Sequence, residues 1–266
     1  MDPSASDLVV TGYDAIYTSW DRSPTLRRIW HDLAAGAGYP QEFRHISFLT
    51  GVELAALAEA LGLDPGGVLV DLACGAGGPS LWITRHSAVR LVGVDLSPVA
   101  LQRTAALADA LGLGSRVEVL RGSFEATGLA AASADAVMSV DALQYAPDKA
   151  GAFVEMARVL RPGGRVAFVA FELEPERVAG LPVWGVDPVA DYRPVLERAG
   201  FSVVRYEETP GWRERVTATF EAVVAEHAAL DAELGVAAAA ALSMEAALTL
   251  EQRPYRRRVL VVADRS

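Results

Sequence analysis

The sequence is poor in cysteine, in lysine and in net positive charge. Its 266 residues include one cysteine, Cys74, which excludes an internal disulfide, and one lysine, Lys149. The formal net charge of −10 at pH 7 argues against a nucleic-acid partner, because phosphate binding requires a basic surface. No apolar run is long enough to cross a membrane, since the alanine-rich stretch 236–250 is interrupted by Glu245.

The amino terminus also lacks the features of a targeting segment. Residues 1–7 contain neither a basic region nor an apolar core, so we expect a cytoplasmic protein with no membrane partner. The hydrophobic content of 52% is sufficient for a folded core, and the length suits one α/β domain with additions. We identify no metal-binding motif and predict no metal site.

Apolar segments of strand length alternate with segments of helical periodicity from residue 68 onward. Such alternation is typical of a parallel sheet covered by helices on both faces. Two longer helical segments, 213–234 and 236–251, interrupt the alternation before a final strand at 258–263. The other predicted segments are strands at 68–72, 90–94, 116–121, 135–140, 165–171 and 201–206, and helices at 24–35, 52–62, 79–87, 98–112, 148–160 and 188–199.

A glycine-rich turn follows the first of these strands, and it is the most informative part of the sequence. The strand carries Asp71 near its end, the turn contains Ala73, Gly75 and Gly77, and the next strand is followed by Asp95. Small residues let a ligand approach the backbone, and the following helix offers free N–H groups. An acid at the end of the second strand suits a ribose diol. A nucleoside-containing cofactor is therefore predicted.

The acid at Asp71 favours a cationic cofactor over a dinucleotide. A dinucleotide fingerprint needs glycine where Ala73 stands, and a pyrophosphate would be repelled by the Asp71 carboxylate. A nicotinamide-dependent oxidoreductase is therefore the weaker alternative. S-adenosylmethionine presents an ammonium group, a sulfonium and a ribose diol, and all three suit this pattern.

Three further motifs follow the glycine turn in order, each at the end of a predicted strand or helix. With that turn, the four motifs are Asp71-Leu-Ala-Cys-Gly-Ala-Gly77, Val94-Asp-Leu-Ser97, Ser139-Val-Asp-Ala-Leu-Gln-Tyr145 and Leu160-Arg-Pro-Gly-Gly164. Together they resemble the motifs of class I S-adenosylmethionine-dependent methyltransferases, of the small-molecule type found in natural-product and ubiquinone biosynthesis. The resemblance covers about residues 50–205.

The resemblance implies a Rossmann-like α/β fold with a seven-stranded, mostly parallel sheet flanked by helices. It also implies that the final strand runs antiparallel beside the strand at 165–171. We therefore divide the chain into an N-terminal lid, residues 1–50, and a methyltransferase domain, residues 51–266. A helical insertion at about 213–251 is expected above the carboxyl edge of the sheet, where ligands bind in open α/β sheets.

The resemblance further implies roles in binding S-adenosylmethionine. Asp71 would hold the amino group, the backbone at Gly75 and Gly77 would face the ribose and carboxylate, and Asp95 would bind the ribose hydroxyls. Ala73 replaces the usual glycine, and we expect its φ to be negative. The remaining cofactor-binding candidates are Leu96, Ser123 and Phe124 around the adenine, Ser139 and Asp141 after the fourth strand, and Tyr17 in the lid.

The reaction centre is expected after the strand at 135–140. Asp141 and Tyr145 are the catalytic candidates there, although Tyr145 could equally pack the loop before Pro147. His45 lies in a His-Ile-Ser-Phe stretch that loosely resembles a His-x-Gly-aromatic segment beside the methyl end of the cofactor in several small-molecule methyltransferases. It is therefore the candidate general base.

These features predict methyl transfer from S-adenosylmethionine to oxygen, nitrogen or carbon of a small, apolar acceptor in specialised metabolism. The alternative is a protein that keeps the cofactor on the same fold without methylating, with a pericyclase-like or binding role. The insertion at 213–251 is predicted to wall the acceptor pocket, and a homodimer interface is the other interpretation. The sequence leaves both pairs of alternatives open.

Overall fold

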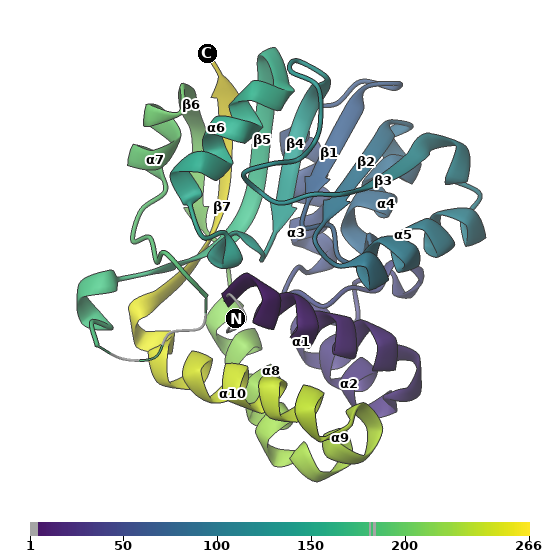
Figure 1. Ribbon diagram of the computed structural model, residues 1–266, viewed down its shortest axis with the longest axis vertical. Helices are drawn as coiled ribbons and strands as arrows, with labels where there is room; N and C mark the ends of the chain where they lie inside the picture. The colour runs from purple at the N-terminus through teal and green to yellow at the C-terminus, as the bar shows by residue number, and fades with distance from the viewer. Residues whose placement is uncertain (1–4, 181, 183–184) are drawn as a thin grey trace.

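A seven-stranded sheet forms the centre of the computed structural model, which describes residues 5–180, 182 and 185–266 (Figure 1). The strands are β1 (Val68–Leu72), β2 (Arg90–Asp95), β3 (Val117–Arg121), β4 (Ala134–Val140), β5 (Leu160–Leu173), β6 (Phe201–Glu208) and β7 (Arg256–Arg265). Their order is β3-β2-β1-β4-β5-β7-β6, and β7 alone among them runs antiparallel to its neighbours β5 and β6. The predicted fold class is confirmed, including the antiparallel strand beside β5.

Helices cover both faces of the sheet and bury an apolar core on each side. One face packs against α3 (Gly51–Leu61), α4 (Gly78–Ser87) and α5 (Pro98–Ala110). The other face packs against α6 (Lys149–Val159) and α7 (Arg193–Arg198). Because strand side chains alternate between faces, Val259 and Val261 of β7 join the second core while Leu260 and Val262 join the first.

A separate group of helices lies beyond one end of the sheet, and we call it the cap. Figure 1 shows these helices in the lower part of the view, with the N-terminal and C-terminal cap helices side by side. They bury a third apolar core of their own, which includes Trp20, Trp30, Phe48, Trp212 and Phe220. The cap helices are α1 (Ala5–Ser19), α2 (Pro24–Ile29) continued by a π-helical turn (Trp30–Ala35), α8 (Trp212–Ala225), α9 (His227–Leu234) and α10 (Val236–Gln252).

The first helix of the cap was not predicted, because the first helix expected from the sequence was at 24–35. The signal for it is present in the sequence: Val9, Tyr13, Ile16 and Tyr17 recur at helical spacing on one side of α1. The division of the chain into a lid and a main domain stays a prediction, and residues 1–4 of that lid lie outside the described residues.

Several helix and strand boundaries differ from the predicted ones, because tertiary contacts and proline override local periodicity. The helix predicted at 213–234 divides at Glu226, which pairs with Arg28, and the next helix places Glu233 to accept hydrogen bonds at the start of α2. The helix predicted from 188 begins at Arg193, just before a proline in its first turn. Strand β5 begins at residue 160, and the pairing register of β4 shifts opposite its Arg-Pro-Gly-Gly segment.

Short 3-10 helices connect several of these elements. One of them positions Gln144 and Tyr145 directly after β4, at the sheet edge that faces the cap. They span Trp20–Arg22, Gln41–Phe43, Gly114–Arg116, Leu143–Tyr145, Pro175–Arg177 and Arg253–Tyr255.

Candidate active site

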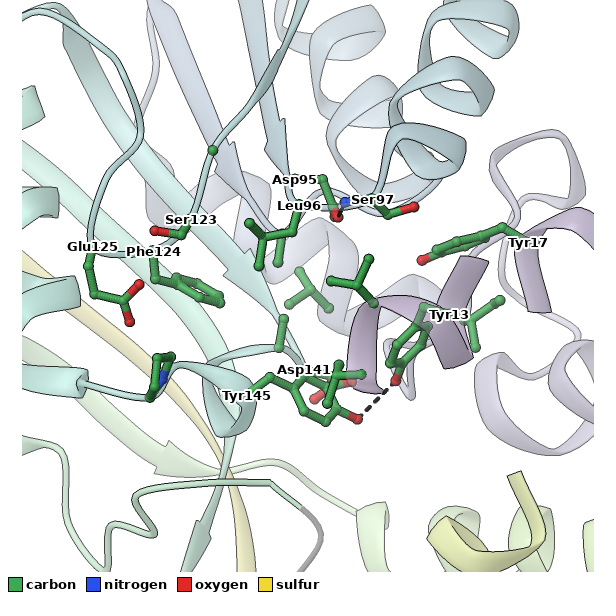
Figure 2. A pocket seen from close by; sticks show the side chains of 18 residues that line it. Tyr13, Tyr17, Asp95, Leu96, Ser97, Ser123, Phe124, Glu125, Asp141 and Tyr145 are labelled. Atoms are coloured by element: carbon green, nitrogen blue, oxygen red, sulfur yellow. Dashed lines mark hydrogen bonds between the residues drawn. The ribbon is translucent and has the colours of Figure 1, made fainter. Parts of the chain in front are cut away.

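A cavity of about 330 Å³ lies where the carboxyl ends of β1 to β4 meet helix α1 (Figure 2). The strand order reverses between β1 and β4, and such switch points are where open α/β sheets bind ligands. Four strand-end segments and the N-terminal region contribute to the wall. The lining residues are Val9, Val10, Tyr13, Tyr17, Ile46, Ala73, Asp95, Leu96, Ser97, Gly122, Ser123, Phe124, Glu125, Val140, Asp141, Ala142, Tyr145 and Pro147.

Asp95 is fixed at the cavity wall by two backbone hydrogen bonds. Its Oδ2 accepts from Gly75 N at 2.9 Å, and its Oδ1 accepts from Ser97 N at 2.8 Å. Burial raises the pKa of this carboxyl, while the N–H groups of Ser97 and Gly75 oppose the rise. The side chain that sequence reasoning selected for the ribose therefore lines the cavity in a defined orientation.

The glycine turn between β1 and α4 depends on left-handed backbone. Gly75 has φ of +55° and Gly77 has φ of +76°. A Cβ built on Gly75 would lie 2.4 Å from Tyr17 Oη, so α1 approaches this turn closely. The expectation of a negative φ at Ala73 was wrong: its φ is +58°, which costs on the order of 1–3 kcal/mol for a residue with a Cβ.

Asp71 is buried beside the cavity and does not line it. The residue is 3% exposed, and burial raises the pKa of its carboxyl to about 7. A hydrogen bond from Ser80 opposes this rise, and the charge of Asp95 adds to it. A cationic group close to Asp71 would stabilise its ionised form.

An apolar slot forms the end of the cavity beside β2 and β3. Leu96 is 37% exposed on its wall, and Phe124 lies nearby after β3, as Figure 2 shows. Ser123 Oγ accepts a hydrogen bond from Ala126 N at 3.1 Å, so the hydroxyl is partly engaged by its own turn. Ser139 is 1% exposed and donates to Leu72 O at 2.9 Å within the sheet, so it does not line the cavity.

Helix α1 closes the cavity with polar contacts to the main domain. Tyr13 and Tyr145 share a hydrogen bond between their hydroxyls at 2.9 Å, drawn as the dashed line in Figure 2. Burial raises the pKa of Tyr13 and of Tyr17, so both phenols are neutral around pH 7. Ser97 donates a further hydrogen bond to Asp14 of α1.

Asp141 lines the cavity, but its carboxylate is already engaged. Arg258, which is 0% exposed, donates through Nε to Oδ1 at 2.8 Å and through Nη2 to Oδ2 at 2.9 Å. Phe48 N donates to Oδ2 at 2.9 Å. These bonds hold Asp141 in a left-handed conformation with φ of +50°. The geometry favours a positioning role for Asp141 over proton transfer.

His45 lies outside both the main cavity and the smaller one described next. Its Nδ1 accepts from Ser47 N at 3.0 Å, and Tyr39 packs edge-on against the ring at 4.3 Å between centroids. Burial lowers the pKa of His45 to about 4, so the ring is neutral at pH 7 with Nδ1 in use as an acceptor. It faces a separate cavity of about 290 Å³ beside α5. This arrangement does not favour His45 as the general base.

A smaller cavity of about 20 Å³ lies on the other side of Tyr13 and Tyr145, between the sheet edge and the cap. It shares Tyr13, Ile46, Asp141 and Tyr145 with the main cavity. The rest of its wall combines six aromatic or aliphatic side chains with five polar or charged ones. Those other residues are Ile16, Trp30, Ser47, Phe48, Gln144, Phe171, Phe220, Leu242, Glu245, Thr249 and Arg256.

Sequence reasoning missed the ion-pair network behind this wall. Arg258 also donates through Nη1 to Glu53 Oε1 at 3.0 Å, and Arg215 pairs with the same carboxylate at 2.7 Å. The sequence holds no local signal for it, because three consecutive arginines, residues 256–258, precede the apolar run of this strand. Nothing in that run distinguishes the buried Arg258 from the half-exposed Arg257.

The described residues contain no group of three or more histidine, cysteine, aspartate or glutamate side chains arranged to hold a metal ion. Cys74 in the glycine turn is 7% exposed, and burial raises the pKa of its thiol. None of the helices in the described part of the chain is long and apolar enough to span a membrane.

Comparison with known proteins identifies the family. The family model of a methyltransferase domain matches residues 70–168. A dimethylglycine N-methyltransferase from Parasynechococcus marenigrum strain WH8102 is 31% identical over 220 residues, which cover 82% of this chain and 74% of that protein. The chain belongs to the class I S-adenosylmethionine-dependent methyltransferases. The family predicted from the sequence motifs is therefore confirmed.

Other relatives match a smaller part of this chain. The sterol 24-C-methyltransferase ERG6B of Gibberella zeae is 28% identical over 155 residues, which are 54% of this chain and 41% of that protein. The chain thus spans about two fifths of that relative. By fold, the cyclase SpnF superposes with a TM-score of 0.77 at 21% identity, covering 100% of this chain and 97% of its own. The cyclopropane synthase MmaA2 from Mycobacterium tuberculosis superposes with a TM-score of 0.72 at 18% identity, covering 96% of this chain and 98% of its own.

Proposed function

We propose that this methyltransferase transfers the methyl group of S-adenosylmethionine to a small, mainly apolar organic acceptor of specialised metabolism. The observation that carries this proposal is that two cavities share a wall made by Tyr13, Ile46, Asp141 and Tyr145. The larger is bounded by the cofactor motifs, and the smaller by apolar side chains of the cap. A cofactor in the first and an acceptor in the second would meet at the shared residues.

The residues of the main cavity fit S-adenosylmethionine. Its volume of about 330 Å³ falls in the usual range of cofactor sites. We propose that Asp95 accepts from the ribose hydroxyls, that Leu96 and Phe124 enclose the adenine, and that the charge of Asp71 attracts the amino group. When bound, this cofactor supplies an electrophilic methyl group on a sulfonium.

Cofactor affinity is expected to rise by up to roughly tenfold between about pH 6 and about pH 8, because the pKa of Asp71 is raised to about 7. Below that pKa the buried carboxyl holds a proton, which must leave when a cationic group binds beside it. The folded state also holds this proton more tightly than the unfolded chain, so the contribution of Asp71 to stability falls as pH rises from about 4 to 7. Calorimetric titration in buffers of different ionisation enthalpy measures both affinity and proton release.

Asp71→Asn serves as the control for this pH dependence, because it removes the titrating group and retains the shape. Any slope that remains in the variant belongs to other titrating groups, namely Asp95, whose pKa burial also raises, or the amino group of the cofactor. Identical pH profiles for the variant and the unmodified chain would contradict the role given to Asp71.

The acceptor is proposed to bind between the sheet edge and the cap. Trp30, Phe48, Phe171, Phe220 and Leu242 line that space, and their side chains suit an apolar molecule. They come from the N-terminal region, from β5 and from the helices that precede β7. This placement supports the predicted use of the insertion as a wall of the acceptor pocket.

Rate enhancement is proposed to come mainly from positioning. Holding a nucleophile in line with a methyl group in a dry site can contribute on the order of 7–11 kcal/mol. Asp141 would act as a positioning residue through its bonds to Arg258, and Tyr145 would shape the shared wall where nucleophile and methyl meet. This mechanism suits an acceptor atom whose lone pair or double bond is reactive without prior deprotonation.

Hydrogen exchange in residues 10–30 is expected to slow when S-adenosylmethionine binds. Helix α1 closes the cavity through Tyr13 and Asp14, so a ligand must enter while these contacts are open, and its presence then favours closure. Mass-spectrometric exchange of the chain with and without cofactor measures the effect, and helix α7, which lines neither cavity, is the internal reference. Unchanged exchange in residues 10–30 would make this region a permanent part of the core.

The proposed activity is tested by incubating the chain with S-adenosylmethionine and ligands that copurify with it. Mass spectrometry should show S-adenosylhomocysteine released together with an acceptor heavier by one methylene. Turnover of the acceptor into an isomer without S-adenosylhomocysteine would instead support the cyclase-like alternative, for which the fold shared with SpnF is the motivating observation.

The proposed association state is open to a separate measurement. Val236 and Met244 of α10 are 74% and 53% exposed, which is the observation that favours a homodimer through the insertion. Light scattering of the unmodified chain and of a Val236→Glu, Met244→Glu variant distinguishes the two states. We propose small-molecule acceptors as the partners of this chain and propose no nucleic-acid partner. The cytoplasmic location expected from the sequence stays a prediction.

A further inference from the structure

We propose that the acceptor carries a hydroxyl group, which is held between Trp30 and Gln144 in the smaller cavity. This inference rests on the proposed function, because it names the chemistry of the acceptor for that same site. It assigns Trp30 and Gln144 as specificity-determining residues.

Among the uncharged side chains in the wall of this cavity, two buried polar atoms have no hydrogen-bond partner. One is Trp30 Nε1, which can only donate, and the other is Gln144 Oε1, which can only accept. Trp30 belongs to the cap and Gln144 to the turn after β4, so the cavity lies between two separate elements. Buried donors and acceptors are nearly always paired in folded proteins, so two orphans beside one cavity indicate a missing partner.

The orientation of the Gln144 amide is fixed by its other end. Gln144 Nε2 donates to Asp141 O at 2.6 Å. Reversing the amide would place two acceptors against each other, because a backbone carbonyl cannot donate. The unpaired atom is therefore the oxygen, and the site presents one donor and one acceptor.

A hydroxyl satisfies both atoms through a single oxygen, since it accepts from Trp30 and donates to Gln144. A carbonyl or a carboxylate could pair only with the indole, and an ammonium only with the amide oxygen. The cavity volume of about 20 Å³ has room for the hydroxyl alone, so cap side chains must move apart to admit the rest of the molecule that carries it. Arg256 and Glu245, which also line the cavity, attract each other, so their opposite charges favour a neutral group.

The hydroxyl is an anchor rather than the atom that receives the methyl group. Trp30 and Gln144 line the smaller cavity and not the main one, whereas Tyr13 and Tyr145 line both. An acceptor held by its hydroxyl would present a different atom at the shared wall. The distance between anchor and reacting atom would then select the position methylated.

Ligand binding measured by nuclear magnetic resonance tests the inference without relying on turnover. The probes are cyclohexanol, cyclohexanone and cyclohexane, which have similar size and differ in hydrogen bonding, each added to the full chain with S-adenosylhomocysteine. The five tryptophans give five indole N–H signals, and Trp30→Phe assigns the relevant one. We expect the Trp30 signal to shift with cyclohexanol, which should bind roughly tenfold or more tighter than cyclohexane, with cyclohexanone between them.

Matched variants separate recognition from general damage. Trp30→Phe and Gln144→Met should each abolish the preference for the alcohol, whereas Trp82→Phe on α4 and Gln102→Met on α5 should leave it unchanged. Equal binding of the three probes, or a preference that survives Trp30→Phe and Gln144→Met, would overturn the inference and leave a bridging water as the partner of both atoms. Methyl transfer is not the readout, so this result and that of the proposed function are independent.

Discussion

Replacing Asp95 with alanine is expected to weaken S-adenosylmethionine binding by roughly 10- to 150-fold, or about 1.5–3 kcal/mol. The carboxylate lines the main cavity and is held by Gly75 N and Ser97 N, so it is already oriented toward a ribose. The substitution removes a charged acceptor from the hydroxyl pair. It also releases the N–H of the glycine turn that Asp95 holds in place.

Isothermal titration measures this effect, and two further variants interpret it. Asp95→Asn keeps an oxygen for one N–H and loses the charge, so an intermediate affinity is expected. Asp64→Ala removes an exposed carboxylate before β1 and should bind normally. Adenosine, which lacks the methionine portion, should lose affinity with Asp95→Ala and keep it with Asp71→Asn. Unchanged affinity of Asp95→Ala for S-adenosylmethionine would remove the ribose assignment.

The sheet and the cofactor edge could be predicted because their signals are local. An apolar strand, a glycine turn and an acid after the next strand are short patterns, and the topology of parallel sheets brings them to one edge. Asp95, Leu96 and Phe124 therefore lie in one cavity, as their positions in the sequence suggested. The negative φ expected at Ala73 was wrong because the turn requires a left-handed residue there, with or without glycine.

The candidate reaction centre depends on contacts that no local pattern contains. His45 was selected by its neighbours in sequence, and the fold packs its ring against Tyr39, beside a separate cavity and behind the shared wall rather than in it. Asp141 lies directly after β4, as predicted, but its partner Arg258 is 117 residues further along the chain. Trp30 lines the smaller cavity because it packs within the cap against Phe48 and Phe220. Such long-range pairings appear only after the cap has been folded onto the sheet.

Replacing Arg258 with methionine is expected to lower the free energy of unfolding by about 3–5 kcal/mol. The guanidinium is fully buried and bonds Asp141, Glu53 and Thr209 simultaneously. Methionine fills much of the same volume without charge, so two carboxylates would remain buried with less compensation. Denaturant unfolding followed by circular dichroism measures the loss.

Arg257→Met is the matched control, because Arg257 is adjacent on β7 and its side chain is 48% exposed. Its ion pair with Glu208 lies near solvent, and the buried Glu172, 3.6 Å away, keeps its hydrogen bond from Tyr206 when Arg257 is removed, so the expected loss is about 1 kcal/mol. Similar losses for the two variants would show that Arg258 is no more important than a surface arginine.

Neutralising the partners separates the two contributions of Arg258. If uncompensated charge causes the loss, adding Asp141→Asn and Glu53→Gln to Arg258→Met should recover part of the stability, because the buried carboxylates are gone. Methyl transfer should not recover in this triple variant, since the φ of +50° at Asp141 and its place in the shared wall depend on the bidentate bond to Arg258. Stability would then depend on charge balance, and catalysis on the geometry that the ion pair imposes.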